Sequence, residues 1–167
     1  MNSKTIALLF VIGALLLSCD NSQSNNKDTR ELTCYIKSIE KSDDGYILKA
    51  LHIDFLHDDE AVEAAKKHNE AAIDVDEKGD TLYSVPNDYY IDIPDKTIHS
   101  HKIAEGLALD LINYEDISKE EFEWQKAKSI SAFLQSEGYK SGSYSERPFE
   151  ITLSGGLIVK ISEIYTP

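Results

Sequence analysis

The sequence predicts an α+β fold in which a small curled antiparallel sheet packs with two helices. Tight turns near both ends of the folded part support this prediction. Asp43-Asp44-Gly45 joins strand-like segments at 33–41 and 45–56, and Ser154-Gly155-Gly156 joins segments at 149–153 and 157–165. Because a tight hairpin makes its two strands antiparallel, we expect antiparallel pairs at both ends of the sheet.

The middle of the chain adds more short strands to this sheet. Their strand-like patterns cover residues 81–85, 89–93, 97–103 and 107–112, with Pro86 and Pro94 as breaks, and residues 73–80 read as a polar connection. With the terminal hairpins this makes about seven short strands, and a sheet of this size tends to curl. The expected architecture is therefore a curled sheet or a half-open, OB-like barrel.

The first helix is expected over residues 60–72. Asp58 or Asp59 can cap its amino end, and Ala61, Val62, Ala64 and Ala65 form a stripe of small residues. Small side chains on one face allow a helix to approach its neighbours closely.

The second helix has the stronger local signals and is expected over residues 118–138. Ser118 and Glu121 have the spacing of a capping box, and Ile117 and Phe122 that of a hydrophobic staple. An apolar stripe at helical spacing follows, and Gly138 is a natural residue to end the helix.

The net charge of the chain excludes some classes of binding partner. The chain has 167 residues, with 30 Asp and Glu against 17 Lys and Arg, so its net charge is −13. Binding to nucleic acid or to anionic lipid headgroups needs clustered Lys and Arg, so we expect no nucleic-acid partner and no electrostatic attachment to a membrane.

The first 19 residues resemble the signal of a bacterial lipoprotein. Lys4 precedes an apolar run over residues 6–17, which is shorter than the roughly 20 residues that span a bilayer, and the run ends at Ser18-Cys19. The resemblance implies removal of residues 1–18 and acylation of Cys19. We therefore expect a lipid anchor in the bacterial cell envelope, a polar tether over residues 19–30, and one α+β domain over residues 31–167.

Cysteine content fits this view of the chain. Cys34 is the only cysteine besides Cys19, so lipidation of Cys19 would leave it without an internal disulfide partner. Cys34 lies in an apolar strand pattern, which indicates a buried and unreactive thiol.

Several short segments together resemble a group of small secreted or lipid-anchored bacterial proteins of unassigned function. The likeness covers most of the chain after Thr33 and rests chiefly on Asn87-Asp88-Tyr89-Tyr90-Ile91 and on the ending Glu163-Ile164-Tyr165-Thr166-Pro167. The resemblance implies similar fold boundaries and export, and it implies no activity.

Histidines provide the one candidate metal site. His99 and His101 are two residues apart in a strand-like segment, so both side chains point to one face, and His52 is a candidate third ligand for zinc. The competing interpretation is a pair of solvated histidines on an outward face. Residues 74–80 superficially resemble a calcium loop, but Lys78 stands where an oxygen ligand is needed.

The sequence contains none of the common catalytic motifs, so we expect a protein that is not an enzyme and needs no cofactor. Tyrosines are numerous, and Tyr89, Tyr90 and Trp124 are candidates for a partner-binding surface, with a lining of the barrel rim as the alternative. The function that we predict is a lipid-anchored binding or accessory module for another protein or an envelope component. The alternative is a zinc-type lipoprotein that uses His99 and His101.

Overall fold

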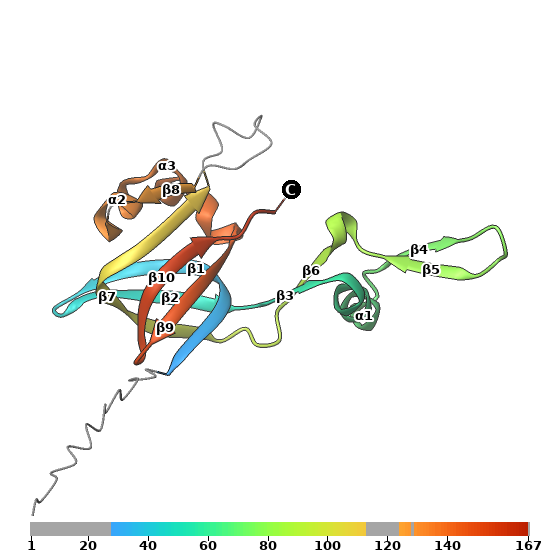
Figure 1. Ribbon diagram of the computed structural model, residues 1–167, viewed down its shortest axis with the longest axis horizontal. Helices are drawn as coiled ribbons and strands as arrows, with labels where there is room; N and C mark the ends of the chain where they lie inside the picture. The colour runs from blue at the N-terminus through green and yellow to red at the C-terminus, as the bar shows by residue number, and fades with distance from the viewer. Residues whose placement is uncertain (1–27, 113–123, 128, 167) are drawn as a thin grey trace, which may run out of the picture.

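The computed structural model describes residues 28–112, 124–127 and 129–166. Two regions are distinguished in Figure 1: a β-barrel, and an arm that leaves the barrel after β2 and returns to it at β7. We define the arm as residues 54–97. The fold is mostly sheet, with three short α-helices among the described residues, so the α+β prediction is confirmed and the expected number of helices is wrong.

The barrel comprises five strands, and a sixth strand is added outside. The bounds of the six are β1 (Thr29–Ser42), β2 (Gly45–His52), β7 (Ile98–Ile112), β8 (Trp124–Ala127), β9 (Pro148–Ser154) and β10 (Leu157–Glu163). Three helical segments lie between β8 and β9, namely α2 (Ile130–Gln135), α3 (Glu137–Lys140) and the 3₁₀ turn η3 (Ser143–Glu146).

The strands form a closed ring rather than a half-open sheet. The order β9-β1-β2-β7 is that of a Greek key, and β10 pairs with both β9 and β7 to complete the ring. The β10–β7 pair is parallel, whereas the other pairs are antiparallel. The two predicted hairpins are present. They predict antiparallel pairs only, so they do not predict the parallel β10–β7 pair that closes the barrel.

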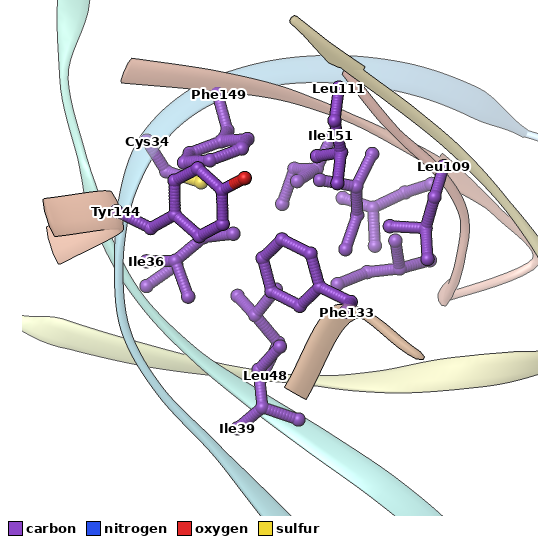
Figure 2. Close-up of a cluster of buried hydrophobic side chains, with 14 residues drawn as sticks. Cys34, Ile36, Ile39, Leu48, Leu109, Leu111, Phe133, Tyr144, Phe149 and Ile151 are labelled. Atoms are coloured by element: carbon purple, nitrogen blue, oxygen red, sulfur yellow. The ribbon is translucent and has the colours of Figure 1, made fainter. Parts of the chain in front are cut away.

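Side chains from all five strands fill the barrel. Figure 2 shows Phe133 of α2 inside this core, with Tyr144 and Phe149 close by. The Phe133 ring is fully buried and stacks on Tyr144 at a centroid distance of 5.2 Å. Cys34 is also fully buried, as predicted, and burial raises the pKa of its thiol to about 12. The core therefore holds without a disulfide.

The predicted helix over 118–138 is wrong at residues 124–127, which are strand, and correct over residues 130–135, which form α2. Residues 113–123 lie outside the described part of the chain, and with them the capping box and the staple. Residues 124–127 form β8, which pairs with β7 from Leu109 to Ile112. Helix α2 begins only after Ser129, whose Oγ accepts a hydrogen bond from the Ala132 amide. Sheet pairing here overrides the local helical pattern.

One carboxylate is buried at the end of β10. The side chain of Glu163 has no exposed surface, and its two oxygens accept hydrogen bonds from Arg147 Nη1 and from the Ile112 amide, each at 3.0 Å. These bonds tie β10 to β7 and to the start of β9. A buried carboxylate needs such partners because desolvation otherwise disfavours its charge.

The arm consists of small elements. They are β3 (Asp54–His57), α1 (Asp58–His68), β4 (Ala72–Val75), β5 (Thr81–Ser84), the 3₁₀ turn η1 (Pro86–Asp88) and β6 (Tyr89–Asp92). Strands β3 and β6 pair with each other, and β4 and β5 form a separate hairpin. Figure 1 shows this hairpin at the end of the arm that lies farthest from the barrel.

Helix α1 matches the predicted first helix in place but not in its cap. The capping residue is His57, without a side-chain bond, and Asp58 and Asp59 fall in the first turn. Carboxylates there still interact favourably with the helix dipole. No helix in the described part of the chain is long and apolar enough to cross a membrane.

Candidate functional site

The three candidate histidines meet where the arm joins the barrel. His52 ends β2, and His99 and His101 stand at the start of β7. His99 lies opposite Ala50 and His101 opposite Leu48, and both of these partners are fully buried. Because directly paired residues share a face of the sheet, the histidines are on the barrel's inner face. Both side chains are half-buried, and that of His99 keeps 38 % of its surface exposed, so the pair is neither fully solvated nor part of the buried core.

The rings form a stack with one direct contact. His52 and His99 are nearly parallel, with centroids 4.1 Å apart, and the centroids of His52 and His101 are 5.2 Å apart. The Nε2 atoms of His52 and His101 are only 2.9 Å apart. These two rings therefore point their Nε2 atoms at each other, which is the geometry of a hydrogen bond between one protonated and one unprotonated nitrogen.

The site favours the neutral form of the His52 and His101 imidazoles. Burial is the main cause that lowers the pKa of His52 to about 4, and the neighbouring imidazoles of His99 and His101 lower it further. The pKa of His101 is lowered by burial, by His99 and by Arg30. A neutral imidazole carries the lone pair that a metal ion needs, so the protonation state at neutral pH favours metal binding.

The arrangement of donors is less favourable for a metal. Within the described residues no group of three or more His, Cys, Asp or Glu side chains has donors arranged to hold a metal ion. The Nε2 atoms of His52 and His101 face each other rather than a shared third point. A zinc ion would require at least one of these rings to turn, so that both lone pairs converge.

The hairpin of the arm is a second candidate site. All eight residues of β4 and β5 are exposed. They include four large apolar side chains with exposed fractions of 68 % for Ile73, 59 % for Val75, 51 % for Leu82 and 43 % for Tyr83. An isolated two-stranded hairpin is marginally stable in water, and clustered apolar exposure marks interaction surfaces.

A hollow lies between this hairpin and α1. Its volume is about 260 Å³, and it is lined by Lys66, Asn69, Ala71, Ile73 and Tyr83. Ile73 and Tyr83 are directly paired across the hairpin, so both side chains share one face. The Lys66 ammonium lies 4.8 Å from the centre of the Tyr83 ring and orients it by a cation–π contact.

The arm concentrates the negative charge of the protein. Residues 54–97 contain 13 Asp and Glu against four Lys, a net charge of −9 out of −13 for the whole chain. Asp76 is used in the hairpin turn, where its Oδ1 accepts from the amides of Lys78 and Asp80. The residues that superficially resemble a calcium loop are thus a hydrogen-bonded turn.

The predicted partner surface of Tyr89, Tyr90 and Trp124 does not form one patch on the barrel. Tyr89 and Tyr90 lie on the arm, where Tyr89 stacks on Phe55 at 5.0 Å and Tyr90 packs beside α1. The Tyr90 hydroxyl donates to Glu70 at 2.7 Å, which raises its pKa to about 12. The backbone of Trp124 belongs to β8, and its side chain, like Cys19, lies outside the described residues.

The exposed hairpin is the feature that the sequence interpretation missed. Residues 73–80 read as a polar connection because five of them are charged. Ile73 and Val75 nevertheless alternate with acidic residues, and Leu82 and Tyr83 follow a turn that contains Gly79. Alternation before a Gly-containing turn, followed by a short strand-like segment, is the pattern that predicts a hairpin.

Comparisons of the chain with protein-family models, with curated proteins and with solved structures find no match.

Proposed function

We propose that this protein is a lipid-anchored, non-enzymatic module of the bacterial cell envelope that binds another protein through its arm. The observation that carries the proposal is the hairpin of β4 and β5, with four exposed apolar side chains at the end of the arm. The barrel provides a stable base, and the lipid on Cys19 and the tether over 19–30 would hold it near a membrane.

The barrel supports an OB-like assignment. Its five strands begin with a Greek key and close through β10, as expected for that architecture. OB-fold barrels commonly bind oligonucleotides or oligosaccharides on the face of their second and third strands. The net charge of −13 argues against an oligonucleotide here, because phosphate binding needs clustered cations.

The proposal is tested by photo-crosslinking in cells. A photoreactive amino acid replaces Val75 in the full-length protein, and a matched variant carries it at Leu157, an exposed apolar residue of the barrel. We expect a protein adduct from position 75 and a weaker one or none from position 157. Equal adducts at both positions, or none at position 75, would refute binding through the arm.

The anchor is tested in the same cells. Cys19→Ser removes the sulfur that would receive the lipid. We expect the variant protein to leave the membrane fraction and its adduct from position 75 to weaken. A variant that stays in the membrane fraction would refute lipidation at Cys19.

A zinc-binding function is the second candidate, and the meeting of His52, His99 and His101 favours it. We expect zinc to raise the melting temperature, and His99→Ala with His101→Ala to abolish that rise. The matched control is His57→Ala with His68→Ala, which removes two histidines of the arm outside the cluster. A rise that persists without His99 and His101 would eliminate this candidate.

A further inference from the structure

We propose that the hollow between α1 and the hairpin receives one apolar side chain from a partner polypeptide whose neighbouring residues are basic. This inference rests on the proposed function, since it names the partner of the same arm. It identifies the hollow as the anchor point and the carboxylates of the hairpin and its turn as the source of selectivity.

The size of the hollow favours a side chain over a small molecule. Its volume of about 260 Å³ is below the roughly 300–1,000 Å³ of sites that enclose drug-sized ligands. Ile73 and Tyr83 form one wall and Ala71 contributes a further apolar surface. An aromatic or branched aliphatic side chain is therefore the group that this hollow suits, and such buried anchors dominate the energetics of interfaces.

Charge indicates what flanks that anchor. Asp74, Asp76, Glu77 and Asp80 lie on the hairpin or in its turn, and the structure gives none of the four an ion-pair partner among the described residues. Lysines or arginines beside the anchor would meet these carboxylates. Complementary charge of this kind speeds encounter and excludes partners of the wrong sign.

The same charge disfavours two other occupants. A second copy of the chain would bring one arm of net charge −9 against another, and like charges repel. An anionic bilayer surface would likewise be repelled by an acidic hairpin. A basic segment of another protein is the occupant to which both the apolar hollow and the carboxylates are suited.

The test uses a library of random peptides displayed on phage and selected on the full-length protein purified in detergent. We expect the enriched peptides to have a net positive charge and one aromatic or branched aliphatic residue. Ile73→Ser with Tyr83→Ser should weaken their binding about tenfold or more. The matched control is Ile98→Ser with Leu157→Ser, which removes two exposed apolar side chains of the barrel and should leave binding unchanged.

A second pair of variants isolates the role of charge. Asp74→Asn with Glu77→Gln leaves the apolar wall intact, and Asn at position 74 can still accept the bond from the Val75 amide. We expect these variants to weaken the binding of basic peptides. Binding should also fall between about 0.1 and 1 M salt, where the screening length shrinks from about 10 to 3 Å.

Each contrary outcome overturns a defined part of the inference. Enriched peptides that are neutral or acidic would refute the basic partner, and peptides that bind equally well without Ile73 and Tyr83 would refute the hollow. A selection that enriches nothing, or self-association through the hairpin, would also overturn it. Crosslinking from position 75 in cells reports on the proposed function independently, because it succeeds with a protein partner of any charge.

Discussion

The barrel and the arm differ in how much of each is buried. The barrel has a cluster of 14 buried side chains, to which all five strands and α2 contribute, whereas the arm has a cluster of three, Ala61, Ala65 and Val85. The barrel strands also form a ring without free edges, while β4 and β5 each have an unpaired edge. Buried apolar area is the main source of stability, so the barrel is expected to carry most of it.

Because fewer of its side chains are buried, the arm is the region better suited to binding a partner. Local stability falls where few apolar contacts are buried and hydrogen bonds are exposed, and binding elements commonly come from such regions. In this protein four large apolar side chains of the arm, Ile73, Val75, Leu82 and Tyr83, are exposed on the hairpin. Removal of a buried side chain from the barrel should therefore destabilise the whole domain, whereas substitutions in the arm should leave the barrel folded.

The largest expected effect is that of Phe133→Ala. Removing this fully buried ring leaves a cavity beside Tyr144 and Phe149, which should lower the free energy of unfolding by about 3–5 kcal/mol. Chemical denaturation measures the loss. Phe55→Ala, which removes a half-buried ring of the arm, is the matched control and should change barrel unfolding far less. Equal losses of unfolding free energy in the two variants would contradict the difference in stability between the barrel and the arm.

Glu163→Gln is expected to have the next largest effect. The carboxylate accepts from two donors, and the amide that replaces it has only one oxygen, so its NH₂ would face a donor. We expect a loss of about 1–3 kcal/mol in denaturation at neutral pH. Glu40→Gln neutralises an exposed carboxylate 3.9 Å from Lys49 and should cost little. A Glu163→Gln protein as stable as the parent would contradict the assigned role.

The histidine cluster is expected to make stability depend on pH. The pKa of His52 is about 4 in the folded protein, below its ordinary value of 6.5, so the unfolded chain binds this proton more readily. Its contribution should be complete above about pH 6.5 and should be lost as the pH falls towards 4. His52→Gln should therefore flatten the stability profile over this range. Parallel profiles for His52→Gln and the parent would refute the role of His52.

The smallest expected effect is that of Tyr90→Phe in the arm. Loss of the hydrogen bond to Glu70 should destabilise the arm by about 0.5–1.5 kcal/mol and leave the barrel unaffected. We expect the backbone amides of α1 to exchange hydrogen faster and those of β1 to exchange at an unchanged rate. Tyr89→Phe is the matched control, since its hydroxyl has no hydrogen-bond partner in the described part of the chain. Faster exchange in β1 as well would mean that arm and barrel open together.

Local patterns predicted those parts of the molecule that local interactions determine. The two hairpins follow from Asp-Gly and Gly-Gly turns, and helix α1 from its alanine stripe, whereas barrel closure depends on a parallel pair between segments about 50 residues apart. Trp124–Ala127 illustrates the limit, because its pairing with β7 overrides a helical pattern. His52 was grouped correctly with His99 and His101, but the 2.9 Å contact between Nε2 atoms depends on the barrel's register.

Hydrogen exchange of the intact protein tests the central claim that the barrel carries the stability while the arm opens separately. Amides of β1, β2, β9 and β10 should exchange only through global unfolding, and those of α1, β4 and β5 should exchange much faster, with a free energy of opening well below that of unfolding. Equal protection in the arm and the barrel would contradict the account, because the hairpin would then belong to the same cooperative unit as the core.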